Sequence, residues 1–474
     1  MSLRCCLSAP PSASLRPLHL VRPLLAAVRS RVLAAVLIAT AASSALAGAS
    51  TSLGAQQLPA PTKEEVERAT TMVEHFHDDL KKNYYDSTFH GVDLEARKRE
   101  TIARIAAAKT GPEAFAQAAD FLASLNDSHT FMYGFDHKNE VHYGYTLKLV
   151  GDSCYFWRVT PGSDAAAKGI ARGDRLVKID GNVPTRRNFF LLQYVYHALS
   201  PRLGAHLTVE HVDGRREELD VKAKVTPGRA VWDWTSQSDI QDLINESERA
   251  NDRLRHRTRP FGDSVLVWRM PQFVYGDDAV IDRIVKRAKG YRGLILDLRE
   301  NPGGAVATEA RLLGNFFDTT IVSTVWHMRD STRTERVQPV SKDPYRGMLV
   351  ILIDAQSASA AEITARTMQI EGRAIVVGDR SAGAVQTSLG FTHRAGFTKY
   401  LPYGASITIA DLTMSDGSRL EGVGVVPDQI VLPTGADMAA GRDPQMARAL
   451  AIVGVTITPE QAAHVIRGGQ DEDP

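Results

Sequence analysis

The chain has few cysteines, no long hydrophobic run and almost no net charge, and each of these absences narrows what it can be. It holds three cysteines in 474 residues, and two of them, Cys5 and Cys6, lie close to the start. If the first residues are removed, Cys154 is alone, and one cysteine can neither close an internal disulfide nor build a structural zinc site. A formal charge of +1 also lacks the basic excess typical of nucleic-acid-binding proteins.

The first 47 residues have the composition of an export signal. They contain five arginines and no acidic residue, so their removal changes the formal net charge from +1 to −4. Arg29 and Arg31 precede the apolar run VLAAVLIATAA, and Ala45-Leu46-Ala47 offers an A-x-A cleavage site. The run is too short for a convincing membrane span, although a membrane-anchored N-terminus is the alternative. We therefore expect a signal peptide over 1–47, a linker over 48–62, and a periplasmic or secreted protein.

Residues 63–138 predict a helical N-terminal region. Apolar residues recur at three- and four-residue spacing between Val66 and Phe76, and a second such pattern runs from Ile102 to Leu125. The pair Gly111-Pro112 separates two of the expected helices. The region ends in the polar stretch LNDSHTFMYG, residues 125–134.

Residues 139–226 change to short β-rich runs with turns between them. The stretch AAAKGIARGDRLVKIDG, residues 165–181, predicts a short helix, a glycine turn and a strand that ends in Asp-Gly. It resembles the signature of PDZ domains, which bind a peptide tail as an added strand and hold its carboxylate on backbone N–H groups. The alternative is a β-rich spacer without a ligand. The resemblance places the peptide-binding loop at Tyr143, Gly144, Tyr145, Thr146 and Leu147.

The rest of the chain predicts an α/β layer. Residues 227–263 are polar and indicate a connector with a charged face. From residue 264, strands rich in Leu, Ile and Val alternate with helical patterns, which is typical of strands buried on both faces. The last helical pattern runs from Pro444 to Val453. We therefore expect this layer to span 264–455 and a tail to span 456–474.

Three stretches of the α/β layer could carry chemistry. The strand in LDLRENPGGAV, residues 296–306, leads into two glycines whose backbone could approach a substrate closely. SASAAEI follows the next strand, and its Ser359 and Glu362 have the spacing of a helix capping box. A serine at a helix N-terminus is equally where a nucleophile would lie. LEGVGVVPD, residues 420–428, places Glu421 before a glycine-rich strand.

In this order and spacing, the three stretches resemble the carboxyl-terminal processing peptidases, also called tail-specific proteases. The resemblance spans roughly residues 63–450 and implies a multidomain α/β protein: a helical N-terminal region, a PDZ-like domain and a core of the Clp-protease/crotonase-like type. It implies Ser359 as the nucleophile, with Ser357 as the nearest rival. The N–H of Ala360 would join that of Gly303 or Gly304 in an oxyanion hole.

The base that should activate this serine is not where many processing peptidases have it. The segment that resembles their lysine motif reads GDRSAGAVQ, and Ala384 stands at the lysine position. Either the protein is inactive or the base comes from elsewhere. Lys399 is near in sequence but matches no motif, whereas Ser-His within LNDSHTFMYG resembles the branch that includes the tricorn core protease. That branch implies His129 as base, with Ser128 and Glu421 supporting it, although His129 alone could equally be a structural residue near a helix end.

The expected function is an exported serine endopeptidase that acts on unfolded polypeptides or on polypeptides recognised by their C-terminal tails. A degenerate peptidase that only binds peptides is the main alternative, and a crotonase-like acyl-transfer enzyme is the third. The sequence holds neither a metal-ligand cluster nor a nucleotide loop, so no cofactor, no metal and no nucleic-acid partner are expected.

Overall fold

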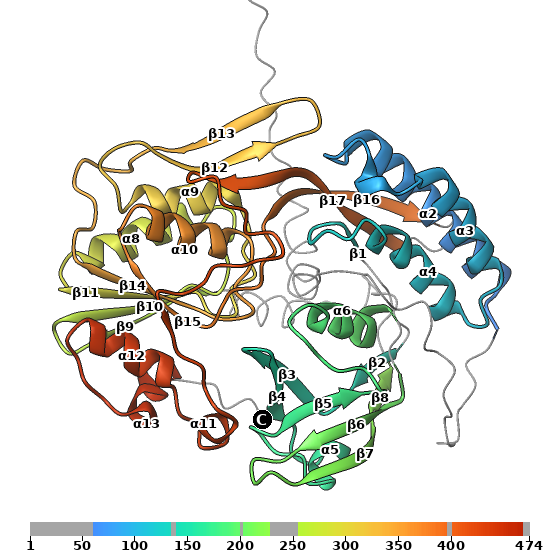
Figure 1. The fold of residues 1–474 in the computed structure, drawn as a ribbon, viewed down its shortest axis with the longest axis horizontal. Helices are drawn as coiled ribbons and strands as arrows, with labels where there is room; N and C mark the ends of the chain where they lie inside the picture. Colours follow the sequence, from blue (N-terminus) through green and yellow to red (C-terminus); the bar gives the residue numbers. More distant parts are fainter. Residues whose placement is uncertain (1–59, 134–138, 200–201, 228–254, 396–400, 468–474) are drawn as a thin grey trace, which may run out of the picture.

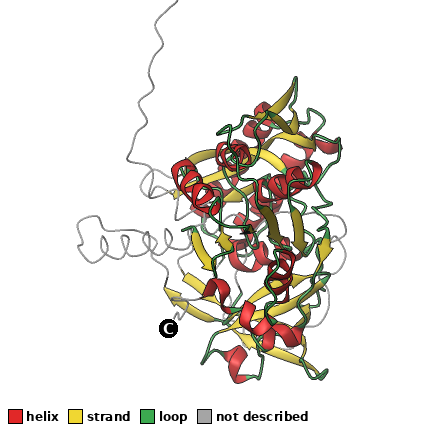
Figure 2. Ribbon diagram, turned by 90° about the vertical axis from the view of Figure 1, so that its left-hand side faces the viewer, coloured by secondary structure: helices red, strands yellow, loops and turns green. Residues whose placement is uncertain are grey.

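The computed structural model describes residues 60–133, 139–199, 202–227, 255–395 and 401–467, which form three larger β-sheets and one two-stranded sheet, with helices around them (Figure 1). The view turned by 90° shows helices and strands in alternating layers (Figure 2). The expected signal peptide at 1–47 and most of the linker lie outside the described residues. Within the described ranges, no helix has both the length and the apolar character needed to cross a bilayer.

The largest layer is a six-stranded sheet in the order β18-β15-β14-β11-β10-β9. Its strands pair in parallel except for β9, which lies antiparallel to β10 at one edge. In chain order they are β9 (Arg257–Phe261), β10 (Val265–Arg269), β11 (Gly293–Asp297), β14 (Met348–Ile353), β15 (Ile375–Gly378) and β18 (Gln429–Ile430).

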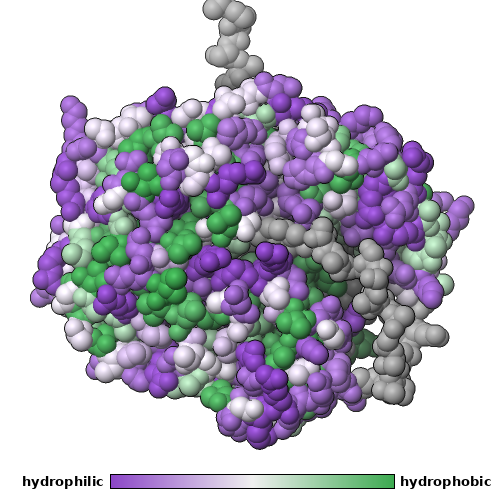
Figure 3. Space-filling model, viewed as in Figure 1, coloured by the Kyte–Doolittle hydropathy of each residue, from purple (hydrophilic) through white to green (hydrophobic). Residues whose placement is uncertain are grey.

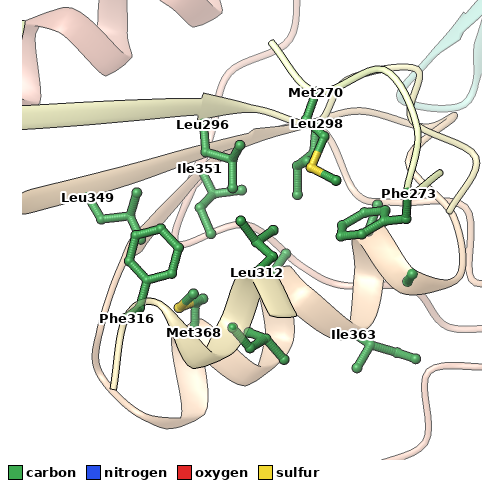
Figure 4. Close-up of a cluster of buried hydrophobic side chains, with 14 of the residues drawn as sticks. Met270, Phe273, Leu296, Leu298, Leu312, Phe316, Leu349, Ile351, Ile363 and Met368 are labelled. Carbon is green, nitrogen blue, oxygen red and sulfur yellow. The ribbon is translucent and has the colours of Figure 1, made fainter. Parts of the chain in front are cut away.

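Helices cover both faces of this sheet because its central strands are apolar throughout. Successive side chains of a strand point to opposite faces, so Leu294 and Leu296 join one apolar cluster while Ile295 joins the other. Figure 4 shows part of the first cluster, with Leu312 and Met368 rising from the helices toward Leu296 and Ile351. The helices on that face are α8 (Asp278–Ala288), α9 (Val306–Gly314) and α10 (Ala360–Ile370).

Residues beyond α12 (Pro444–Ile452) help to cover the other face of the sheet, so the expectation of a tail over 456–474 is wrong for residues up to 467. This face is covered by α12 and by two short helices beyond it, α13 (Pro459–Ala462) and α14 (His464–Arg467). Ala462 and Val465 are buried in the second apolar cluster, and Arg259 of β9 donates to the carbonyl of Val465. Short helices carry little periodicity, so the sequence pattern stopped at α12, whereas the fold continues to residue 467.

The helices of the N-terminal region pack on a second, antiparallel sheet. They are α2 (Lys63–Asn83), α3 (Leu94–Ala106) and α4 (Gly111–Ala123), with a 3₁₀ turn, η1 (Phe89–Gly91). The apolar face of these helices buries against Tyr403, Ala405 and Ile407 of the sheet. Its strands are β1 (Phe131–Tyr133), β12 (Ile321–His327), β13 (Thr332–Val337), β16 (Gln386–Ala395) and β17 (Leu401–Met414). Strand β17 thus joins the α/β layer to the first helices (Figure 1).

The third sheet contains the segment in which the sequence resembles a PDZ domain. It has the antiparallel order β3-β4-β5-β6-β7, so β3 is an edge strand. Its elements are β3 (Tyr145–Val150), β4 (Ser153–Val159), α5 (Asp164–Ala167), β5 (Arg175–Ile179), α6 (Phe189–Tyr194), η2 (Val195–Leu199), β6 (Gly204–Glu210) and β7 (Arg216–Lys222). A separate pair, β2 (Asn139–His142) with β8 (Lys224–Pro227), brings the two ends of the segment together.

Charged contacts hold this third sheet against the α/β layer. Lys148 of β3 lies 2.7 Å from Glu300 and 2.9 Å from Asp354, and Arg186 lies 3.0 Å from Asp379. Helix α11 (Gly435–Ala439) also reaches this junction. On the face seen in Figure 3, apolar residues form several separate patches among polar ones. The α/β layer therefore shares a packed boundary with each of the other two sheets.

Candidate active site

Ser359 lies at the turn between the buried strand β14 and helix α10. Its backbone has a conformation that residues other than glycine rarely adopt. Its φ is +55° and its ψ is −121°. Such a residue costs on the order of 1–3 kcal/mol and persists only where its surroundings hold it. A sharp strand-to-helix turn of this kind lifts a serine hydroxyl clear of the backbone, as the nucleophile elbows of hydrolases do.

Main-chain hydrogen bonds hold the turn from both sides. The N–H of Ser359 donates to the carbonyl of Ala384 at 2.9 Å and to Oε2 of Glu362 at 3.1 Å. The N–H of Ala358 donates to the carbonyl of Asn301 at 2.9 Å. The rival Ser357 is fully buried, and its hydroxyl donates to the carbonyl of Leu298 at 2.8 Å. Of the two serines, Ser359 is therefore the one whose hydroxyl faces a base.

The group that Ser359 faces is the imidazole of His129, which lies on the loop between α4 and β1. Its Nε2 lies 3.4 Å from Oγ of Ser359, and its Nδ1 lies 2.6 Å from Oγ of Ser128. The Ser128 hydroxyl in turn donates to Oε2 of Glu421 at 2.8 Å. Four side chains from three distant parts of the chain thus form one continuous hydrogen-bonded row.

Asp127 anchors the loop that carries Ser128 and His129. Its Oδ1 accepts the N–H of His129 at 3.0 Å, the N–H of Thr130 at 2.7 Å and the hydroxyl of Thr408 at 2.8 Å. Its Oδ2 accepts the hydroxyl of Tyr84, at the end of α2, at 2.6 Å. Asp127 lies within the stretch LNDSHTFMYG, and an aspartate that accepts N–H groups two and three residues later is a common local turn.

Part of the chain matches a known protein family. Residues 264–431 match the description "Peptidase family S41". A tail-specific protease of Haemophilus influenzae is 30% identical over 181 residues, which cover 37% of this chain and 25% of that protein. A carboxyl-terminal-processing protease of Picosynechococcus is 25% identical over 365 residues, which cover 73% of this chain and 80% of that protein. Residues 264–431 belong to peptidase family S41. This match and these relatives support a serine peptidase, which is a hydrolase, in this part of the chain.

Solved structures show a similar fold around the S41 domain. The structure of mature CPAF complexed with lactacystin has a TM-score of 0.57 and 16% identity, and the match covers 85% of this chain and 100% of that one. A crystal structure of a CPAF S499A mutant has a TM-score of 0.59, with the same identity and 79% of this chain covered. At this level of identity the likeness concerns the fold alone.

The glycine loop of the S41 domain lies directly against Ser359, but only part of it can donate to a substrate. A Cβ added to Gly303, whose φ is +90°, would lie 2.6 Å from Cβ of Ser359, so only glycine fits there. The N–H of Gly303 donates to Oδ1 of Asn301 at 2.8 Å, which removes it from the expected oxyanion hole. Among the described residues, the N–H groups of Gly304 and Ala360 donate to no protein acceptor.

Burial governs the charges in the row of four side chains. It lowers the pKa of His129 to about 4, against the opposing pull of Asp127, so the imidazole is neutral at physiological pH. Burial raises the pKa of Glu421 to about 8, which its hydrogen bonds from Val385 and Ser128 oppose and the charges of Asp127 and Glu362 reinforce. An ionised Glu421 would accept from Ser128 and leave Nδ1–H of His129 as the donor, so Nε2 would be free to take a proton.

Ala384, which stands where the processing peptidases have their lysine, lies in the same site but has no group that could act as a base. Ala384 packs its half-buried methyl group against the apolar cluster of the third sheet, and its carbonyl accepts from Ser359. The other lysine that was weighed, Lys399, lies outside the described residues. In the part of the chain that the structure describes, His, Cys, Asp and Glu side chains form no group of three that could hold a metal ion.

The expected peptide-binding loop lies at the start of edge strand β3, beside α6. Tyr143 and Tyr145 point into the core of the third sheet, Leu147 is half-buried, and Thr146 is exposed. Gly144 has a φ of +76° and leaves no room for a Cβ beside Ser163. An apolar pocket separates the loop and β3 from α6 and η2, and its lining includes Tyr143, Leu147, Phe189, Leu192, Tyr196 and His197.

Proposed function

We propose that the protein is an exported serine endopeptidase in which Ser359 is the nucleophile and His129 is the base. The observation that carries the proposal is the row Ser359–His129–Ser128–Glu421, in which each side chain is within hydrogen-bond distance of the next. The 3.4 Å gap between Ser359 and His129 is within the range seen in substrate-free sites, where such contacts are often long. This arrangement needs no lysine at position 384.

The chemistry follows from the positions of these groups. His129 Nε2 takes the proton of the Ser359 hydroxyl while Oγ attacks the peptide carbonyl, and the N–H groups of Ala360 and Gly304 stabilise the oxyanion that forms. The imidazolium then protonates the leaving amine, so the C–N bond breaks and an acyl-enzyme remains. A water molecule, deprotonated by the same imidazole, attacks that ester and releases the new carboxyl terminus. Ser128 and Glu421 orient the imidazole through its other nitrogen.

We further propose that residues 139–226 are a PDZ-like domain that selects substrates by their C-terminal tails, and that residues 63–138 are a helical domain that carries the base. The support for the first assignment is that β3 is an edge strand with an apolar pocket beside it, so a peptide could be added along that edge. Titrating full-length Ser359→Ala protein with a tail peptide and with its C-terminal amide tests this assignment. Equal affinity for the two peptides would contradict carboxylate capture.

The export assignment rests on the sequence alone: arginines, an apolar run and an A-x-A site within residues 1–47. We propose that the mature protein begins near Gly48 and resides in the periplasm or outside the cell. Mass spectrometry of the native protein measures its first residue directly. A retained segment from Arg29 to Ala47 would contradict cleavage and favour an anchored N-terminus.

A catalytically degenerate, peptide-binding protein is the second candidate, and the observation in its favour is Ala384 in place of the family's lysine. A fluorophosphonate probe, which reacts only with activated serine hydroxyls, separates the two. We expect labelling of the wild-type protein, none of the Ser359→Ala variant, and full labelling of Ser357→Thr, which keeps the buried hydroxyl. An unlabelled wild-type protein that still binds tail peptides would establish the degenerate function. A crotonase-like acyl transferase has no structural observation in its favour.

A further inference from the structure

Glu362 is a buried carboxylate on the first turn of α10, immediately behind the nucleophile turn, and the proposed mechanism does not use it. Its side chain is fully buried, yet four groups donate to it. Oε1 accepts the hydroxyl of Ser381 at 2.5 Å and the N–H of Gly383 at 2.7 Å. Oε2 accepts the N–H of Ala384 at 2.9 Å and that of Ser359 at 3.1 Å. A capping box accounts for only the last of these contacts.

The four contacts join the nucleophile turn to the loop over residues 381–385. Ser359 contacts that loop a second time, since its N–H also donates to the carbonyl of Ala384. The next residue of the loop, Val385, donates its N–H to Oε2 of Glu421 at 2.7 Å. Glu362 and Glu421 therefore hold adjacent peptide groups of one loop, Glu362 on the side of Ser359 and Glu421 on the side of His129.

The charge of Glu362 matters for this geometry. Four donors point at two oxygen atoms, and three of them are N–H groups that cannot accept an added proton; only the hydroxyl of Ser381 could accept one. The hydrogen bonds favour the ionised form, whereas burial raises the pKa of the carboxyl to about 7. Lowering the pH below about 7 should therefore protonate Glu362 and weaken the attachment of Ser359 to the loop.

We propose that Glu362 is a positioning residue for hydrolysis: its carboxylate holds the strained Ser359 backbone and the 381–385 loop in register, so that Oγ of Ser359 meets His129 and the Ala360 N–H points at the oxyanion. The proposal rests on the proposed function, since it assumes that Ser359 is the nucleophile. Ile363, the next residue, is a buried member of the apolar cluster beneath the sheet, so its packing helps to hold α10 in place behind the turn.

Glu362→Gln tests this proposal because it keeps the volume of the side chain but turns an amide NH₂ toward two of the four donors. We expect kcat for a fluorescently quenched casein to fall on the order of 10²-fold with KM nearly unchanged, because a displacement of about 1 Å at a reacting atom can cost that much. The rate of fluorophosphonate labelling should fall in parallel. Ser381→Ala, which removes one donor, should show a smaller fall of the same kind.

The pH dependence of labelling separates positioning from a general loss of structure. If both Glu362 and Glu421 must be ionised, the logarithm of the wild-type labelling rate should fall toward low pH with a slope near 2, and near 1 in Glu362→Gln. Glu309→Gln is the matched control, because Glu309 is a buried carboxyl of the same domain that burial also gives a raised pKa, of about 8. It should leave kcat and the slope unchanged.

The outcomes distinguish this inference from the proposed function. No labelling of the wild-type protein would overturn the function itself. Labelling of wild type at Ser359, with Glu362→Gln and Ser381→Ala both at the wild-type rate, would overturn the role of Glu362 and leave the function intact. If Glu362→Gln does not fold, Ser381→Ala decides: an unchanged rate in that variant contradicts the proposal. An equal fall in Glu309→Gln would also contradict it.

Discussion

The two halves of the candidate site are built in different ways. Ser359 and the glycine loop come from neighbouring strands of one sheet, and short main-chain hydrogen bonds such as Ala358 to Asn301 join them directly. His129 lies on the loop between a helix and a strand of the second sheet. It is 230 residues from Ser359, and its neighbour Ser128 is 293 residues from Glu421. One half is local to the α/β layer, whereas the other exists only where two layers meet.

The two halves of the site therefore depend on different contacts. The nucleophile turn depends on the packing of one domain, so it should keep its shape whenever the S41 domain is folded. The position of His129, the proposed base, depends on Asp127, which accepts one hydrogen bond from Tyr84 at the end of α2 and another from Thr408 of β17. Any change that moves the first helices relative to β17 should therefore separate base from nucleophile without unfolding the catalytic layer.

Removing either reacting group should have the largest effect. We expect Ser359→Ala and His129→Ala each to lower kcat on the order of 10³-fold or more, and the double variant to lose little beyond either, because the two act as a unit. Steady-state hydrolysis of an unfolded protein substrate measures this. Multiplicative losses in the double variant, or a nearly active His129→Ala, would return the Asp127–Thr130 loop to a structural role.

Glu421→Gln should cost less, about 10- to 10²-fold in kcat, since Glu421 orients the imidazole and transfers no proton to substrate. Because burial raises the pKa of Glu421 to about 8, wild-type activity should rise as pH increases through that range, when the carboxylate forms and sets the tautomer of His129. The Gln variant should lack this rise. A wild-type rate that is flat from pH 6 to 9 would contradict the role of Glu421.

Asp127→Asn should lower kcat by roughly 10-fold, because it weakens the anchor of the His129 loop and leaves both reacting groups in place. The matched control is Asp93→Asn, which alters a similar side-chain cap, to the N–H of Ala96 at the start of α3, and Asp93 has no hydrogen bond to the four side chains of the row. We expect the control to change thermal stability by about 1 kcal/mol or less and kcat not at all. Equal kinetic losses in both variants would contradict a specific anchor.

The contribution of Glu421 to stability should fall with rising pH, whereas activity should rise. A carboxyl group with a raised pKa in the folded state stabilises the fold most at low pH, and that contribution is lost as pH rises through the folded value. For Glu421, raised from 4.5 to about 8, the Tm of the wild type minus that of Glu421→Gln should decrease between pH 6 and 9. Differential scanning calorimetry at matched ionic strength measures it. A constant or increasing difference would show that Glu421 is not strained by burial.

The smallest effect is expected at Lys399, which has no role in the proposed site. Lys399→Ala should keep most of the wild-type kcat. An inactive Lys399→Ala variant beside an active His129→Ala variant would transfer the role of base from the second layer to the lysine, and the contrast between the two halves would disappear.

Most of the helices and strands, and the candidate nucleophile, could be predicted from the amino-acid sequence alone. Buried parallel strands are continuous apolar runs, and the turn after each of them is short, so Asn-Pro-Gly-Gly and Ser-Ala-Ser-Ala-Ala could be read locally as two adjacent loops. The family resemblance assigned the serine and the missing lysine from the same short stretches. The α12 helix followed from its periodicity, whereas the four-residue helices α13 and α14 are too short to have one.

Contacts between distant segments set which polar groups already have a hydrogen-bond partner and which can act on a substrate. Ser357 and Ser359 are alike in sequence, but a carbonyl 59 residues away accepts from Ser357. Gly303 and Gly304 are likewise equivalent until Asn301 takes the N–H of the first. Asp127 and Glu362 show their importance only through partners on other elements. Hydrogen bonds between distant segments produce no recognisable pattern in the sequence, because the fold, and not the order of residues, brings their donors and acceptors together.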